Sequence, residues 1–168
     1  MLEGTPAVRL NPCYNCGMDT NDLSPDSAAN DSGTLAYEVV EHSADWAIRA
    51  HGRDFAELLL NAALGMTSLL VTDMAQVPLS EERYVVVDAF DRESMLVEWL
   101  GELAYLAESE GLVFPQIELQ EATPEEVRAV LRGGPAPQLL KHIKAVTYHN
   151  LEVVETAQGL EATIVFDV

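Results

Sequence analysis

The sequence predicts an α+β fold, with one largely antiparallel sheet and two long helices packed on one face of it. Two observations predict this class. Apolar residues alternate in about seven short segments, as in half-buried strands, and recur at three- and four-residue steps in two long segments, as in amphipathic helices. The strand-like segments follow one another directly near the C-terminus, so we expect hairpins and antiparallel pairing there.

The expected elements follow in chain order. Strands are expected at 37–40, 46–50, 82–90, 113–119, 143–155 and 160–168. A turn at Gln158-Gly159 joins the last two strands into a hairpin. The first helix covers 55–71, and the second runs from the N-cap Asp91 to Glu110, where Gly111 suits its end.

The first 33 residues differ from the rest in composition. Residues 17–33 are almost all small, polar or acidic, with no apolar periodicity. Such a segment cannot bury enough apolar surface to offset the entropy of ordering it. We therefore expect a disordered acidic N-terminal tail at 1–33 and a single folded domain at 34–168.

Charge excludes several classes of function. Nine Lys and Arg residues stand against 28 Asp and Glu residues, which gives a formal net charge of −19 at pH 7. A field of this sign repels phosphates, so we expect no direct binding to nucleic acid and none to an anionic membrane. The same field favours metal cations and basic protein surfaces as partners.

Several familiar signals do not occur in the sequence. No apolar run reaches the roughly 18 residues of a membrane-spanning helix, and the N-terminus does not resemble a secretory signal, so we expect a cytoplasmic protein. The glycine-rich nucleotide-binding loops, the nucleophile elbow and the zinc-protease motif are missing. Cys13 and Cys16 form either half of a zinc site or an incidental pair. Their role and the self-association of the chain stay open.

Carboxylates gather at the end of the chain. Asp167 stands one residue before the terminal carboxylate of Val168, at the tip of the last expected strand, and Asp45 supplies a third carboxylate if its loop lies beside the chain end. Carboxylates held together repel unless they are protonated or bridged by a cation. Hard cations such as Ca²⁺ and Mg²⁺ prefer oxygen ligands. The alternatives are a metal site and a solvated terminus that binds nothing.

Three further polar residues are candidates for lining a site or contacting a partner. His42 lies in the segment Glu-His-Ser-Ala-Asp between two expected strands, where the pattern fits either a site or a surface turn. If 143–155 is one strand, Lys144 and His149 lie on opposite faces of it. Lys144 then neutralises carboxylates or forms an ion pair on the strand face, and His149 is a ligand, a proton carrier or a hydrogen-bonded structural residue.

Three segments, taken together, resemble the archease family. They are 37–52 (YEVVEHSADWAIRAHG), 91–114 (DRESMLVEWLGELAYLAESEGLVF) and 143–153 (IKAVTYHNLEV), followed by the terminal IVFDV. The resemblance covers 35–168 in the family's order. This sequence departs from the family's pattern at Ser43, where Thr is commoner, and at Trp46, where smaller residues are usual; neither departure removes a metal ligand.

The resemblance implies a small α+β protein that serves as a cofactor of an RtcB-type GTP-dependent RNA ligase in tRNA splicing and RNA repair. It implies a metal site, usually described with calcium, at Asp45, Asp167 and Val168, and it aligns Lys144 with the lysine of the family's Ile-Lys-Ala motif. It also implies a strand at 125–134. The local pattern leaves that region open, because Thr-Pro-Glu-Glu is typical of a helix start.

We therefore expect a non-enzymatic activator that promotes guanylylation of the ligase through an acidic metal-binding face. The metal is expected to be Ca²⁺, with Mg²⁺ or Mn²⁺ as alternatives. Two other functions stay open at this point. One is a small metal-dependent hydrolase that uses His42 or His149 as a base. The other is a chaperone-like module with a structural ion.

Overall fold

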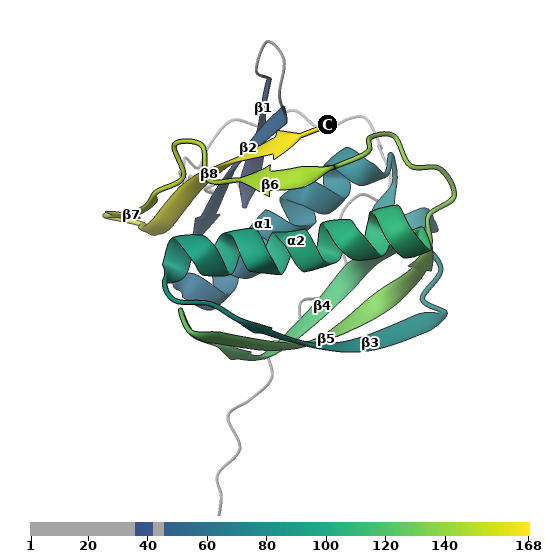
Figure 1. Cartoon of the computed structure of the whole chain (residues 1–168), viewed down its shortest axis with the longest axis horizontal. Helices are drawn as coiled ribbons and strands as arrows, with labels where there is room; N and C mark the ends of the chain where they lie inside the picture. Colours follow the sequence, from purple (N-terminus) through teal and green to yellow (C-terminus); the bar gives the residue numbers. More distant parts are fainter. Residues whose placement is uncertain (1–35, 42–45) are drawn as a thin grey trace, which may run out of the picture.

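Two helices lie between two antiparallel sheets in the computed structural model, which describes residues 36–41 and 46–168 (Figure 1). The strands are β1 Tyr37–Glu41, β2 Trp46–Gly52, β3 Glu81–Asp88, β4 Leu112–Ala122, β5 Glu126–Pro135, β6 Ala145–Thr147, β7 Val153–Thr156 and β8 Gly159–Asp167. The helices are α1 Phe55–Leu70, α2 Arg92–Glu110 and the short 3₁₀ helix η1 Met74–Gln76. None of them has both the length and the apolar composition needed to span a membrane.

The strands divide between two sheets. The terminal sheet has the order β1-β2-β8-β6, and β7 pairs with a second stretch of β8; the middle sheet has the order β3-β5-β4. Every one of these pairings is antiparallel. The predicted α+β class, with antiparallel strands and two long helices, is confirmed. The described strands form two sheets, however, where the sequence predicted one.

The second sheet follows from the composition of α1. Ten of its 16 residues are buried, and they occupy more than half of the helix circumference, leaving beyond the first turn only the face of Leu60, Leu64 and Ser68 partly exposed. A sheet on one face cannot cover such a helix, so a second layer is needed. Accordingly, α1 contacts β2 of the terminal sheet and β4 of the middle sheet. The nearly continuous apolar run at 58–66 is the sequence signal for this second layer.

The ends of α2 match the prediction. Asp91 accepts a hydrogen bond from the Ser94 main-chain N–H at 2.7 Å, and the Ser94 hydroxyl accepts one from the Asp91 N–H at 3.0 Å. These reciprocal bonds form a capping box. At the other end Gly111 has φ 68°, a left-handed conformation that glycine adopts without strain, and its N–H donates to the Ala107 carbonyl.

The two helices are joined through a buried tryptophan. Trp99 of α2 is fully buried, and its Nε1 donates to the main-chain carbonyl of Leu59 in α1 at 3.2 Å. The bond satisfies the one polar group of this large side chain, which otherwise fills the space between the helices.

The prediction of a single strand at 143–155 is wrong. The segment forms two strands, β6 and β7, that both pair with β8. Thr147 pairs with Val165 and Val153 pairs with Ala162, so the five residues 148–152 on one side stand opposite the two residues 163–164 on the other. The extra residues bulge out at 148–152, where Asn150 has φ 52°. A left-handed residue interrupts the extended backbone that a continuous strand needs.

Residues 125–134, for which the local sequence pattern did not decide between helix and strand, lie almost entirely in strand β5, as the resemblance implies. Val127, Ala129 and Leu131 alternate along it, and each is fully buried. Their burial against the helices outweighs the local helix signal, because tertiary packing commonly overrides propensity. The expected tail at 1–33, with Cys13 and Cys16, lies outside the described residues, and so its disorder stays a prediction.

Candidate functional site at the end of strand β8

Four strands of the terminal sheet carry paired residues that form one row across the sheet. Glu41 of β1 pairs with Trp46 of β2, Trp46 pairs with Phe166 of β8, and Phe166 pairs with Val146 of β6. Paired residues on neighbouring strands are about 5 Å apart. The row therefore brings together chain segments that are distant in the sequence, next to the last residues of β8 (Figure 1).

The end of β8 presents one exposed carboxylate and one half-buried residue. Phe166 is fully buried and anchors the strand, whereas the Asp167 side chain is exposed. Val168 is half-buried and packs against the core. The apolar side chains on both sides of Asp167 thus hold its position while its carboxylate faces solvent.

Lys144 contacts this end of the chain twice. Its main-chain N–H donates to the Asp167 carbonyl at 2.8 Å, and its Nζ donates to the main-chain oxygen of Val168 at 3.1 Å. The positive charge of Lys144 therefore lies beside the predicted metal ligands Asp167 and Val168. Of the predicted site residues, the structure brings these three together.

Glu108 of α2 fixes the approach to β6. One of its carboxylate oxygens accepts from the Ile143 N–H at 3.0 Å, and the other lies 2.9 Å from the His142 Nδ1. Ile143 itself is buried, with only 1% of its surface exposed. These contacts tie residues 142–143 to α2 and thereby position Lys144. Sequence analysis did not identify Glu108, because the pairing of a helix with a loop 35 residues later leaves no local pattern.

Trp46, the first described residue of β2, is covered by a lysine. The Lys141 Nζ lies 4.1 Å from the centroid of the Trp46 ring. This distance is typical of a cation–π interaction. The contact adds a second positive charge to the same edge of the sheet.

The other predicted site residues lie elsewhere or outside the described residues. Asp45 and His42 belong to the undescribed segment 42–45. His149 lies in the bulge beyond the far end of β6 from Lys144, where it is exposed and its Nε2 is 3.1 Å from the Asn150 Nδ2. A base at His149 is therefore separated from Asp167 by the length of β6.

The described residues do not by themselves form a metal centre. Within 36–41 and 46–168 there is no cluster of three or more His, Cys, Asp or Glu side chains able to hold an ion. Asp167 and Val168 supply oxygen atoms, which are the donors that a hard divalent cation prefers. The donor chemistry fits such a cation, and the third predicted ligand, Asp45, directly precedes Trp46 in the row described above.

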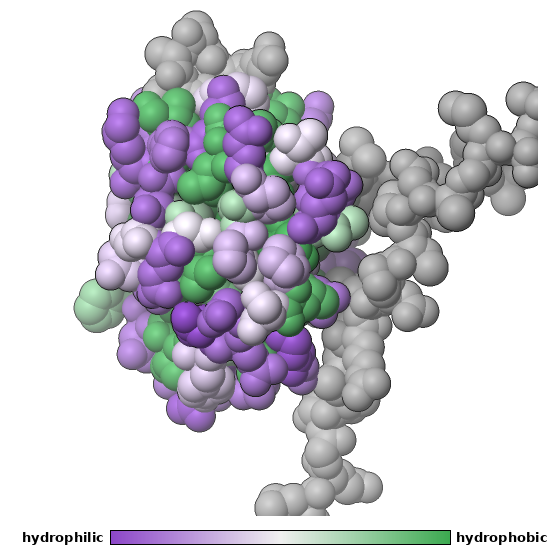
Figure 2. All heavy atoms as spheres, turned by 90° about the vertical axis from the view of Figure 1, so that its right-hand side faces the viewer, coloured by the Kyte–Doolittle hydropathy of each residue, from purple (hydrophilic) through white to green (hydrophobic). Residues whose placement is uncertain are grey.

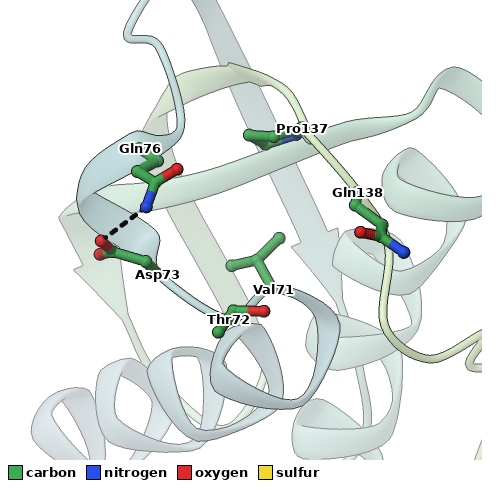
Figure 3. Close-up of a pocket in the computed structure, with 6 residues that line it drawn as sticks. All are labelled: Val71, Thr72, Asp73, Gln76, Pro137 and Gln138. Atoms are coloured by element: carbon green, nitrogen blue, oxygen red, sulfur yellow. Dashed lines mark hydrogen bonds between the residues drawn. The ribbon is translucent and has the colours of Figure 1, made fainter.

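One hollow in the surface lies where both α-helices end. It has a volume of about 250 Å³, and Val71, Thr72, Asp73, Gln76, Pro137 and Gln138 line it (Figure 3). The Asp73 carboxylate accepts from the Ala75 N–H and the Gln76 side chain, so both of its oxygens are engaged in capping η1. Hydrophilic residues cover much of this end of the molecule, with hydrophobic ones among them (Figure 2). We assign no ligand to this hollow.

A second and larger hollow lies between α2 and β6. It has a volume of about 410 Å³ and is lined by Gly101, Ala104, Tyr105, Glu108, Ser109, Ile143, Lys144, Ala145 and Val146. Figure 1 shows β6 running alongside α2 at this position. We call this hollow the groove. Because Lys144 lines it and also contacts Val168, the groove adjoins the end of β8.

Comparison with known proteins decides the family. A sequence model of the Archease protein family (MTH1598/TM1083) matches residues 37–168. Protein archease of Methanosarcina mazei is 37% identical over 140 residues, which cover 79% of this chain and 95% of that protein. Protein archease of Archaeoglobus fulgidus is 32% identical over 138 residues, covering 80% of this chain and all of that protein. The chain belongs to the archease family.

Solved archease-like structures share the fold. The solution structure of Methanobacterium thermoautotrophicum protein 1598 matches with a TM-score of 0.61 at 26% identity, covering 79% of this archease and 99% of that chain. A Thermotoga maritima crystal structure described as an archease, possible chaperone, matches with a TM-score of 0.57 at 24% identity, covering 77% and 94%. The resemblance inferred from the four sequence motifs is therefore confirmed at the level of the family.

Proposed function

We propose that this archease activates an RtcB-type GTP-dependent RNA ligase by binding to it and promoting its guanylylation. The observation that carries the proposal is the convergence at the end of β8. Lys144, Asp167 and Val168 are in contact there, and Phe166, which precedes Asp167, is paired with Trp46, which follows Asp45. Asp167 is thus paired within the sheet, Val168 follows it, and Asp45 immediately precedes a paired residue in the sequence.

The charge of the chain supports a protein partner. A formal net charge of −19 disfavours RNA as a direct ligand and favours a basic protein surface. A ligase that binds RNA and GTP needs such a surface around its active site. Complementary charge accelerates the association of two proteins more than it strengthens the final complex.

The proposed metal site consists of Asp45, Asp167 and the terminal carboxylate of Val168. A divalent cation held there, with Ca²⁺ as the expected ion and Mg²⁺ or Mn²⁺ as alternatives, would supply positive charge for phosphate oxygens of the nucleotide. The exposed side chain of Asp167 suits a site that meets a partner. Lys144 holds the oxygen of Val168 in place and provides a second cation for a phosphate or for the partner.

A chaperone-like role is the second candidate, because the Thermotoga maritima relative is described as a possible chaperone. The two functions differ in what they require. Activation of a ligase requires the carboxylates at the end of β8, whereas the binding of unfolded chains requires exposed apolar surface. A variant that loses only a carboxylate therefore separates them.

The test is the guanylylation of a cognate ligase with GTP and Mn²⁺, with and without the archease. We expect the wild type to raise the rate of labelling and Asp45→Ala or Asp167→Ala to remove most of this stimulation. Asp88→Ala is the matched control, because Asp88 is an exposed carboxylate on β3 of the other sheet. The proposal fails if the wild type stimulates no cognate ligase, or if all three variants stimulate like the wild type.

A further inference from the structure

The groove between α2 and β6 contains a helical glycine, Gly101, whose small size is not required by packing against any residue that the structure describes. Gly101 lies in the middle of α2, and a Cβ atom added there would have no neighbour within 4 Å outside the adjoining backbone of the helix. Glycine is among the poorest helix formers, so a helix interior usually contains it only where packing leaves no room for a side chain. No contact within the described part of the chain requires glycine at this position.

The surface around Gly101 suits an extended chain segment. Ala104, Ile143 and Val146 give the groove an apolar lining, and Tyr105, which is 60% exposed, stands at its rim. Across from α2, β6 is the outer strand of the terminal sheet in the described part of the chain. One row of its main-chain N–H and C=O groups is thus left without a ladder partner there, as in sheets that accept an added strand.

The charges beside the groove favour a basic occupant. Glu98 and Tyr105 lie three positions before and four positions after Gly101, so all three share one face of α2. Glu98 and its neighbour Glu102 form no ion pair with any described residue. The charged groups lining the groove are already engaged, because Glu108 binds residues 142–143 and the Lys144 Nζ binds Val168. Glu98 and Glu102 lie outside the lining, one turn and one residue from Gly101 along α2, and are available to pair with a cation on a segment that extends past the groove.

We propose that this groove receives an extended basic segment of the partner protein, which places an apolar side chain over Gly101 and a Lys or Arg beside Glu98. The inference rests on the proposed function and extends it, because it names a docking surface that adjoins the site at the end of β8. The groove binds the partner segment, and the lack of a side chain at Gly101 leaves space for the apolar side chain of that segment.

The experiment measures the affinity of the archease for a cognate ligase by biolayer interferometry. Gly101→Trp fills the groove, and Gly101→Ala is its control because it changes the helix without occupying much space. We expect Gly101→Trp to raise the Kd by at least about tenfold and Gly101→Ala to raise it much less. Circular dichroism and the Tm of each variant verify that the fold is kept.

Two further pairs of variants test the groove without relying on Gly101. Tyr105→Ala is compared with Tyr84→Ala, because Tyr84 is 59% exposed on the other sheet and Tyr105 is 60% exposed. Glu98→Lys is compared with Glu125→Lys, which changes the net charge equally in the exposed loop between β4 and β5. We expect the first variant of each pair to weaken binding about tenfold and the second to leave it nearly unchanged.

The outcomes separate the two proposals. If the wild type neither binds nor stimulates a cognate ligase, the proposed function fails and the groove proposal fails with it. If the wild type binds and a folded Gly101→Trp variant binds equally well, the groove proposal alone is overturned. Equal loss of affinity in both members of the tyrosine pair or the charge pair also overturns it.

Discussion

The Nζ of Lys144 donates a hydrogen bond to the main-chain oxygen of Val168 at 3.1 Å, and the Lys144 N–H binds the Asp167 carbonyl one residue earlier. The side chain and the main chain of one residue thus hold the end of β8. Lys144 is exposed, so this contact stabilises the fold little, and its position among the expected metal ligands points to a role in function.

Lys144→Gln is predicted to change activity without changing stability much. An exposed ion pair contributes about 1 kcal/mol or less, so the free energy of unfolding should stay within that range. We expect stimulation of the ligase to fall strongly, because the cation beside Asp167 is lost. Arg53→Gln is the control, since Arg53 is an exposed cation paired with Glu57 at the start of α1. Equal stimulation by both variants would show that Lys144 has no functional part.

A few residues appended after Val168 are predicted to impair activation. In a chain that ends at Val168, the oxygen bound by Lys144 belongs to a carboxylate, and an extension converts it into an amide carbonyl with weaker affinity for a cation. The same peptide added before Met1 should leave the stimulation of guanylylation unchanged. If both tagged proteins stimulate the ligase equally, the terminal carboxylate is not a ligand.

Truncation of Trp99 is predicted to destabilise the domain strongly. Trp99 is fully buried between the helices and binds the Leu59 carbonyl. We expect Trp99→Ala to lower the free energy of unfolding by about 3–5 kcal/mol. Trp99→Phe keeps most of the apolar volume and should cost about 1–2 kcal/mol, largely for the lost hydrogen bond. Urea unfolding measures both, with Tyr84→Ala as an exposed control expected to cost about 0.5 kcal/mol or less.

A smaller loss is expected if α1 and α2 close over the cavity left by Trp99→Ala. A loss no greater than that of Tyr84→Ala would contradict the placement of Trp99 in the core.

The N-cap of α2 is predicted to make stability depend on pH. Hydrogen bonds from Ser94, first from its side chain and then from its main chain, lower the pKa of Asp91 below its ordinary value. Its contribution is complete above the unfolded pKa of about 4 and is lost as the pH falls through the lower pKa of the folded state. Asp91→Asn keeps a capping acceptor that does not titrate in this range.

The stability of the wild type should therefore fall relative to that of Asp91→Asn as the pH is lowered from neutral through about pH 4. Chemical denaturation at a series of pH values measures this difference. Many of the 28 acidic residues titrate in the same range, so only the difference between the two proteins isolates Asp91. A difference that does not change with pH would mean that the cap carries no shifted carboxyl.

The sequence predicted well those elements whose first and last residues carry a local capping signal. Asp91 and Gly111 mark the ends of α2 through cap chemistry, which depends on a few neighbouring residues. The bulge at 148–152 escaped prediction because its cause is the register of two short strands on β8, which the sequence of either strand does not contain. The second sheet escaped for a related reason, since the apolar run at 58–66 indicates that much of α1 is buried but does not indicate which strands cover it.

The candidate site was predicted only in part, because some of its contacts are local in the sequence and others are long-range. The grouping of Asp167 with Val168 follows from their adjacency. Lys144 was a candidate to neutralise carboxylates from the sequence, the resemblance aligned it with a family motif, and the structure places it in contact with both residues. Glu108 and the groove at Gly101 depend on contacts between α2 and the segment before β6, which are long-range. An isolated glycine in the helical pattern was the one available signal for the groove.

The central claim is that the end of β8 holds a divalent cation, and its most direct test is a calorimetric titration of the protein with Ca²⁺, with Mg²⁺ and Mn²⁺ in parallel. Asp167→Asn keeps the size of the side chain, and Asp88→Asn removes the same charge from the other sheet. We predict one binding site in the wild type, an unchanged Kd for Asp88→Asn, and a Kd raised at least about tenfold for Asp167→Asn. The absence of saturable binding to the wild type, or an unchanged Kd for Asp167→Asn, would contradict the account.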